Sequence, residues 1–386
     1  MIKTMVATTT ELDDTSIAVD EIIAGLDYEG KLLKNTIGIV ACHYEFVHTD
    51  VFKAICDSLP FDVVGAVASQ LSAAGTTGTF LLAITVLTSD DVEFKKVITP
   101  SLLGDPKKTV SDSYNSSVGD KKPALILTYA PYIIQNCSDD YVNALTEASS
   151  GVPCFGTMAV DDTMDFSRSF VLADGEYYRD QMAMVLIYGD ISPKFFVAGI
   201  SENKIIDGKG ALVTKSAGSI VMELNERPVV DYFNSLGLVQ AGEKLYSMSS
   251  LPFLLDFNDG TPKVFRFLVM LSEQQHAICA GAMPQGSTMY IASTDASDVM
   301  STTGEVLSRM KNQLDGVSVV LSYTCVGRAI ALGSEQFKEM ELMSETLGKD
   351  VPYMSALSGG EVCPTEVLAD KSINRCHNNT FVACML

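Results

Sequence analysis

The residues best suited to chemistry lie late in the chain, directly after an apolar stretch at 317–324. Cys325 follows this stretch and stands three residues before Arg328. A thiol beside a guanidinium can have a lowered pKa and act as a nucleophile, but a catalytic dyad would also need a base such as His377. The pattern leaves a nucleophilic or redox thiol open. It favours a thiol that is structural or contacts a ligand, so we predict no catalytic residue.

Arg328 stands among small and apolar residues, where a guanidinium can clamp a carboxylate through two parallel hydrogen bonds. The alternative is an internal ion pair, with Glu361 as the candidate partner. Glu361 itself ends the segment Ser358-Gly359-Gly360-Glu361. The N–H groups of such a turn can bind an anion and its carboxylate an amino group, although a plain turn has the same sequence. Since no Gly-Lys-Ser/Thr follows, a nucleotide phosphate loop is not indicated.

The histidines and cysteines give little sign of a metal. His43 and His48 are too few for a zinc site without further ligands, and the nine cysteines include no CxxC pair. We therefore predict reduced, mostly buried thiols, no metal site and no cofactor. Haem bound by one histidine stays open, because a lone ligand looks like a packed imidazole in a sequence.

Composition excludes two classes of partner. The 386 residues carry a formal net charge of −21, with no cluster of Lys and Arg. We predict that the protein binds neither nucleic acid, which requires such clusters, nor an anionic membrane surface, which would repel it. No segment reaches the roughly 18 apolar residues of a membrane helix, and the N-terminus lacks the apolar stretch of a signal peptide. These features predict a cytoplasmic protein.

One arrangement of elements recurs along the chain. Apolar strands at 37–42, 124–129 and 317–324 are each followed by a helix and a second strand. The second strands, at 61–68, 152–159 and 351–358, hold Gly or Ser at their fifth position, where a small residue allows close backbone approach. Ser138 and Ser334 are the expected caps of the second and third helices. A strand at 287–294 echoes the first strand of the chain, at 3–9.

Residues 190–285 instead predict antiparallel strands, interrupted by one helix that starts near Pro228. Polar residues and glycine cluster at 202–209, which predicts a boundary between a domain at 1–205 and one at 206–386. The predicted class is α+β, with mixed, largely antiparallel sheets covered by helices and with repeated strand-helix-strand-strand units.

The part of the chain from 210 to 386 resembles the C-terminal domain of FIST proteins, a family named for F-box and intracellular signal transduction. The motifs of that domain match Cys325-Val-Gly-Arg328, Gly360-Glu361 and Asn378-Asn-Thr380. Further matches follow in the same order upstream: Val213-Thr214, Glu223-Leu-Asn225, Pro228, Phe265-Arg266 and Pro284-Gln-Gly286.

Residues 36–205 look like the partner N-terminal FIST domain, through the strands at 37–42 and 82–87 and the turn Val63-Val-Gly65. Relatives tend to carry Ala-Gly-Glu after that glycine strand. Here the positions read Ala68-Ser-Gln-Leu71, which weakens the case for a second site in this half.

The resemblance implies an intracellular sensory module for a small ligand, with amino acids or related compounds proposed for the family. We therefore expect a polar metabolite to bind between the two halves. Arg328 would hold a carboxylate, Glu361 an amino or hydroxyl group, and Arg266 a second anionic group. Cys325 and the backbone of Gly359-Gly360 would form the floor.

Because no output segment accompanies these domains, a separate signalling protein would act as partner. Some relatives look like haem-based gas sensors, which keeps a haem-binding gas sensor open. An enzyme with Cys325 as nucleophile and a scaffold that binds only protein also stay open.

Overall fold

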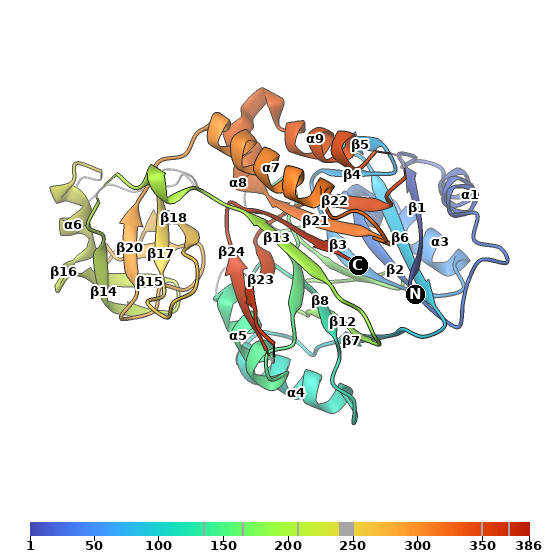
Figure 1. Ribbon diagram of the computed structural model, residues 1–386, viewed down its shortest axis with the longest axis horizontal. Coiled ribbons are helices and arrows are strands. Elements are labelled where there is room, and N and C mark those ends of the chain that lie inside the picture. Colours follow the sequence, from blue (N-terminus) through green and yellow to red (C-terminus); the bar gives the residue numbers. More distant parts are fainter. Residues whose placement is uncertain (134–135, 164–165, 207, 239–250, 349, 370) are drawn as a thin grey trace.

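The body of the protein consists of three consecutive units that repeat one succession of elements (Figure 1). The computed structural model describes residues 1–133, 136–163, 166–206, 208–238, 251–348, 350–369 and 371–386. Each unit runs strand, helix, strand, helical segment, strand, hairpin, strand.

Unit 1 contains β1 (Lys3–Thr9), α1 (Thr15–Leu26), β2 (Asn35–Cys42), α2 (Glu45–His48), α3 (Val51–Ser58), β3 (Asp62–Val67), the hairpin β4 (Leu71–Ala73) and β5 (Thr76–Gly78), and β6 (Leu82–Ser89). Unit 2 contains β7 (Glu93–Ile98), α4 (Pro106–Ser117), β8 (Leu125–Ala130), α5 (Ser138–Ala148), β9 (Cys154–Met158), the hairpin β10 (Val171–Ala173) and β11 (Glu176–Tyr178), and β12 (Ala183–Tyr188). Unit 3 contains β13 (Lys194–Ala198), η1 (Glu202–Lys204), α7 (Ala296–Lys311), β21 (Val320–Cys325), α8 (Val326–Leu332), η2 (Gly333–Glu335), α9 (Lys338–Leu347), β22 (Tyr353–Ser358), the hairpin β23 (Glu361–Val367) and β24 (Ser372–His377), and β25 (Phe381–Met385).

A separate lobe, residues 211–292, is inserted between β13 and α7 of unit 3, and we call it the inserted unit. It lies at the left of Figure 1, beside the three-unit body. Its strands form one seven-stranded antiparallel sheet with its own apolar core. Its elements are β14 (Ala211–Ala217), β15 (Ile220–Leu224), β16 (Arg227–Pro228), α6 (Val229–Ser235), β17 (Pro252–Asp256), β18 (Val264–Leu271), β19 (Ala277–Cys279) and β20 (Thr288–Ile291).

The three units are interlocked because each gives its hairpin to the sheet of a neighbour. The six-stranded sheets have the orders β1-β6-β2-β3-β10-β11, β7-β12-β8-β9-β23-β24 and β13-β25-β21-β22-β4-β5. Within each sheet the central pair is parallel and its neighbours are antiparallel. An equivalent backbone hydrogen bond joins each strand to the hairpin segment it receives. The N–H groups of Val67, Met158 and Leu357 donate to the carbonyls of Phe170, Gly360 and Gln70, respectively.

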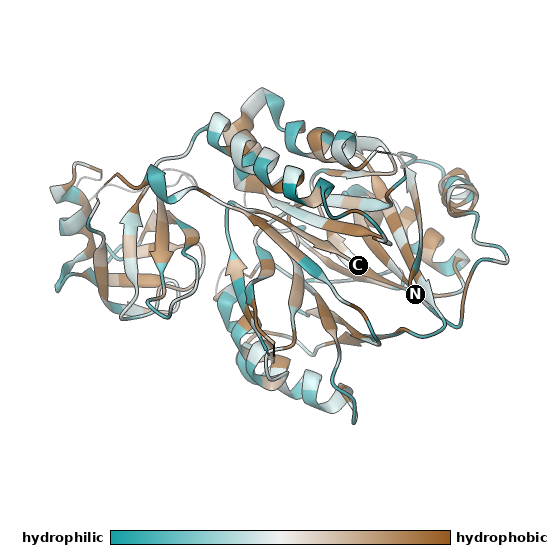
Figure 2. Ribbon diagram, viewed as in Figure 1, coloured by the Kyte–Doolittle hydropathy of each residue, from teal (hydrophilic) through white to brown (hydrophobic). Residues whose placement is uncertain are grey.

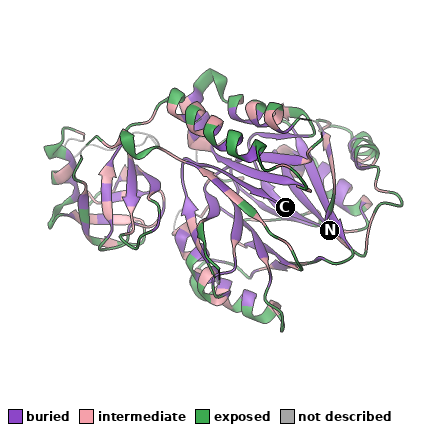
Figure 3. Cartoon of the chain, viewed as in Figure 1, coloured by how far each residue is buried: buried purple, intermediate pink, exposed green. Residues whose placement is uncertain are grey.

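Alternating side chains build two kinds of core. In β2, Ile37, Ile39 and Ala41 face a central core that all three sheets share, whereas Val40 and Cys42 face the helices of unit 1. This alternation is what the period of two in a strand requires. Figure 2 shows the apolar residues concentrated on the strands and Figure 3 shows those strands buried beneath helices with exposed outer faces.

The predicted fold class is confirmed: the sheets are mixed and largely antiparallel, helices cover them, and the unit repeats. Two helix caps are wrong, since Ser138 is the first residue of α5 behind Cys137, and α9 starts at Lys338 behind Phe337. The strand predicted at 287–294 is also not the counterpart of β1. It forms β20 of the inserted unit, while β13 holds the edge position in the sheet of unit 3. Among the described residues no helix is long and apolar enough to cross a membrane.

The sequence predicts Gly or Ser at the fifth position of the segments that form β3, β9 and β22. In β3 and β9 the structure requires glycine there. A Cβ on Gly65 would lie 1.8 Å from the Val40 carbonyl oxygen, and one on Gly156 would lie 1.8 Å from that of Thr128. In unit 3 the same register pairs Ser322 with Ser355, so a side chain is accommodated there.

We expect Gly65→Ala and Gly156→Ala each to lower the free energy of unfolding by about 2 kcal/mol or more, because the new methyl group overlaps backbone. Ser355→Ala is the matched control and should change it by less than about 1 kcal/mol, since the buried Ser355 hydroxyl has no hydrogen-bond partner among the described residues. Urea unfolding of the three variants measures the difference. Equal losses at all three positions would contradict the argument.

Candidate functional site

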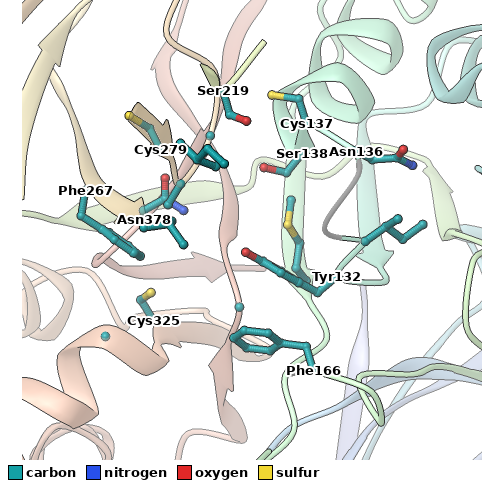
Figure 4. A pocket seen from close by; sticks show the side chains of 18 of the residues that line it. Tyr132, Asn136, Cys137, Ser138, Phe166, Ser219, Phe267, Cys279, Cys325 and Asn378 are labelled. Carbon is teal, nitrogen blue, oxygen red and sulfur yellow. The ribbon is translucent and has the colours of Figure 1, made fainter. Parts of the chain in front are cut away.

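A cavity of about 280 Å³ lies where the inserted unit meets units 2 and 3. Figure 4 shows side chains from these three parts of the chain converging on it. Unit 2 contributes Tyr132 and Asn136 from the segment after β8, Cys137 and Ser138 at the start of α5, and Phe166. Unit 3 contributes Cys325, Gly327, Gly359 and Asn378, and the inserted unit contributes Ser219, Phe267, Cys279 and Gly281 among others.

The residues predicted as a site fall into two groups. Cys325 and Gly359 line the cavity directly. Arg328, Ser358, Gly360, Glu361 and Arg266 are buried around it, and none of these five contributes to the lining. The Ser358 hydroxyl donates to the Gly360 carbonyl at 2.7 Å and accepts from Thr157 at 2.8 Å, which fixes the turn that presents Gly359.

Cys325 ends β21 and is the N-cap residue of α8. Burial raises the pKa of its thiol well above the ordinary value, and the nearby Glu361 carboxyl acts in the same direction. Arg328 opposes the shift only weakly. A thiol in this setting is a lining group rather than an activated nucleophile.

The guanidinium of Arg328 donates its hydrogen bonds to acceptors within the protein, and its carboxylate partner is Glu339 of α9. Its Nε lies 3.1 Å and its Nη2 2.9 Å from Glu339 Oε1. The same guanidinium donates to the Val299 and Asn379 carbonyls and to Thr303. The alternative ion pair with Glu361 is therefore wrong, because α8 and α9 bring Glu339 against the guanidinium instead.

Glu361 is buried, and only one of its two carboxyl oxygens is hydrogen-bonded. Its Oε2 accepts from the Thr380 hydroxyl at 2.7 Å, whereas Oε1 has no hydrogen-bond partner in the part of the chain that the structure describes. Burial raises its pKa from the usual 4.5 to about 8, and the polar groups of Thr380 and Ser358 offset this only in part. Glu361 is therefore mainly protonated at neutral pH.

Arg266 joins the inserted unit to the body. Its Nη2 donates to Asp139 Oδ1 of α5 at 2.9 Å, and its Nη1 donates to Asn378 Oδ1 and to the Cys376 carbonyl at 3.0 Å each. The second oxygen of Asp139 accepts from the Ala282 N–H at 2.7 Å. Gly281 leaves room for this contact, since a Cβ there would lie 2.7 Å from Arg266 Nε.

Sequence reasoning missed the aromatic wall of the cavity. Tyr132 and Phe166 stack with ring centroids 4.4 Å apart and planes tilted by 33°. Both lie in segments between elements, where no periodicity marks a residue as functional. Asn378 had a signal, because it belongs to the closing Asn-Asn-Thr motif. Among the described residues no group of three His, Cys, Asp or Glu side chains is placed to hold a metal ion.

The fold and the cavity define a mixed α/β protein of three interlocked units, with an inserted antiparallel unit that closes a cavity of small-molecule size. The FIST N domain matches residues 36–227 and the FIST C domain matches residues 230–364, so the chain belongs to the FIST family, as its sequence predicted. FIST domains are associated with sensory roles in signal transduction.

Similarity beyond the family is remote. No curated protein sequence matches the chain. Among solved structures, cyanuric acid hydrolase from A. caulinodans is similar over 100% of this chain and 99% of its own, with 8% identity and a TM-score of 0.38. PurL from T. maritima complexed with ATP is similar over 100% of this chain and 71% of its own, with 10% identity and a TM-score of 0.18. Similarity at this level does not extend to function.

The raised pKa of Glu361 predicts that stability falls as pH rises. Between about pH 4.5 and pH 8 the folded protein holds a proton that the unfolded chain has released, so the contribution of Glu361 is complete below this interval and lost above it. The slope is at most about 1.4 kcal/mol per pH unit. Urea unfolding at pH 5, 6.5 and 8 should show the stability of the wild type declining relative to Glu361→Gln. A difference that does not change with pH would contradict this.

The Arg328–Glu339 pair predicts a non-additive double variant. Arg328→Met leaves the Glu339 carboxylate buried without a cation, which should cost about 3–5 kcal/mol. Adding Glu339→Leu removes the stranded charge, so the double variant should be more stable than Arg328→Met alone. Urea denaturation measures both. A double variant less stable than Arg328→Met would show that Arg328 and Glu339 are not each other's main partners.

Proposed function

We propose that this protein is a small-molecule sensor whose ligand binds in the cavity between the inserted unit and the body. The observation that carries the proposal is the position of the cavity. Its walls come from segments far apart in sequence, at 131–166, 219–281 and 325–378. A ligand there would contact all three segments at once. Its binding could therefore change how these segments are arranged, which a sensor requires. The sensory association of FIST domains supports the same function.

The predicted halves, 1–205 and 206–386, both contribute walls to the cavity, which supports binding between them. In this proposal Cys325 and Gly359 contact the ligand. Arg328, Ser358, Gly360, Glu361 and Arg266 instead hold the lining segments in place from behind. An incoming carboxylate would have to displace Glu339 from Arg328 or Asp139 from Arg266, and both pairs are buried. Direct clamping by either arginine is therefore not part of the proposal.

Binding would act on the docking of the inserted unit. Arg266 and Asp139 already join this unit to α5 at the edge of the cavity. A ligand that touches both sides stabilises the docked arrangement by its differential affinity for that arrangement. We propose that a separate protein partner reads this change in the cytoplasm. An amino acid or similar polar metabolite is the ligand class that the sequence suggests, and the chemistry of the lining narrows that class.

A cavity-filling variant tests the site. Ala280 lines the cavity, whereas Ala217 belongs to the same unit, is exposed and does not line it. The probes are the amino acids, their amides, and common organic acids, heterocycles and aromatic amides. At a concentration of 100 times its Kd, a true ligand stabilises the folded state by about 2.7 kcal/mol, which raises the unfolding temperature by several degrees.

We expect at least one probe to stabilise the wild type and Ala217→Trp but not Ala280→Trp. Differential scanning calorimetry provides the measurement, because its signal does not depend on the introduced Trp. If every stabilising probe acts equally on Ala280→Trp, the ligand binds elsewhere and the proposed site is wrong.

A further inference from the structure

The described lining of the cavity carries no charged side chain, in a protein whose formal net charge is −21. The polar groups of its lining residues are amides, hydroxyls and thiols, from Asn136, Ser138, Ser219, Asn378, the tyrosines Tyr132 and Tyr141, and the cysteines. The buried guanidinium groups of Arg266 and Arg328 are engaged by Asp139 and Glu339. A buried ionic group of a ligand would thus meet no described counter-charge, which makes its desolvation costly.

The apolar lining combines aliphatic side chains with aromatic rings and sulfur atoms. Figure 4 shows Tyr132 and Phe166 on the side of unit 2, facing Phe267 and Cys325 across the cavity. Met158, Met270 and Cys279 add further sulfur atoms to the walls. Aromatic rings interact favourably with other rings and with polarisable sulfur through their faces and edges. The volume of about 280 Å³ lies just below the roughly 300–1,000 Å³ of pockets for drug-sized ligands, which favours a small ring compound.

One polar group in the lining has a fixed orientation. Asn378 Oδ1 accepts from Arg266 Nη1 at 3.0 Å. Because a guanidinium only donates, this bond assigns the oxygen and nitrogen of the amide. The Nδ2 group donates to no residue in the described part of the chain, and in Figure 4 it points toward the cavity. Asn378 therefore presents a hydrogen-bond donor to a ligand.

We propose that the ligand is an uncharged, planar ring compound that carries a hydrogen-bond acceptor, such as an aromatic amide or a neutral heterocycle. Its ring packs among Tyr132, Phe166 and Phe267, and its acceptor binds Asn378 Nδ2. This inference rests on the proposed function, because it assigns a ligand class to the same cavity. It excludes zwitterionic amino acids and carboxylates from the proposed ligand class.

Three probes of similar size separate the properties that the inference combines. Benzamide is planar and neutral, benzoate replaces its amide by a charge, and cyclohexanecarboxamide keeps the amide but loses the aromatic plane. Titration followed by saturation-transfer NMR gives their dissociation constants, which for such small molecules fall in the millimolar range. We expect benzamide to bind at least about tenfold more tightly than either of the others.

Asn378→Asp tests the donor. The substitution keeps an oxygen for Arg266 and replaces Nδ2 by a second oxygen, so the shape of the side chain is preserved. We expect the affinity for benzamide to fall at least about tenfold. Ala280→Trp should abolish benzamide binding and Ala217→Trp should leave it unchanged.

The outcomes separate the two proposals. If benzoate or a zwitterionic amino acid binds as tightly as benzamide, and Ala280→Trp blocks it, the ligand class is wrong and the site stands. Benzamide binding that survives Asn378→Asp unchanged overturns the role of Nδ2. If no probe binds, the inferred class is also wrong. Benzamide binding that is indifferent to Ala280→Trp overturns both the class and the proposed site.

Discussion

The exchange of hairpins between units is the constraint on which the rest of the structure depends. No unit completes its own sheet: β3 needs β10 from unit 2, β9 needs β23 from unit 3, and β22 needs β4 from unit 1. Antiparallel pairing fixes the register of each exchange, since a slip by one residue would turn every side chain to the wrong face. The carboxyl ends of β3, β9 and β22 must therefore meet, and the cavity opens beside this meeting point.

The repeated scaffold carries different side chains at equivalent places. The registers Val40 with Gly65, Thr128 with Gly156 and Ser322 with Ser355 align the three central strand pairs. Three residues after the first member of each pair stand His43, Pro131 and Cys325. The buried His43 of unit 1 contacts Asp162 of unit 2, whose side chain is 45% exposed, whereas Cys325 faces the cavity. The inserted unit interrupts unit 3 alone and covers this region, so the symmetry of the backbone does not extend to the site.

Local patterns in the sequence predict much of the fold. The strands with Gly or Ser at the fifth position form β3, β9 and β22, and Cys325 and Gly359 do line a cavity. The hairpin exchange could not be predicted, because β4 or β23 has the same alternation whichever sheet it joins. The partner of Arg328 was missed for a related reason. Glu339 lies on a helix whose packing depends on the whole of unit 3, while Glu361 looked suitable because it shares a motif. Tyr132 and Phe166 lie outside periodic elements, where sequence gives no direction to a side chain.

The hydrogen bond between Arg266 and Asn378 couples the docking of the inserted unit to the orientation of an amide in the cavity. The guanidinium holds the inserted unit against the body through Asp139, and the same group decides which end of the Asn378 amide faces the cavity. If the unit swings away, the amide is free to turn over, and an acceptor atom can then stand where a donor stood. In the proposed sensor, chemical selectivity therefore exists only in the docked arrangement. In that sensor, a substitution that weakens the docking of the inserted unit would also lower the selectivity of the site, so the strength of the proposed response and its specificity would not change independently during evolution.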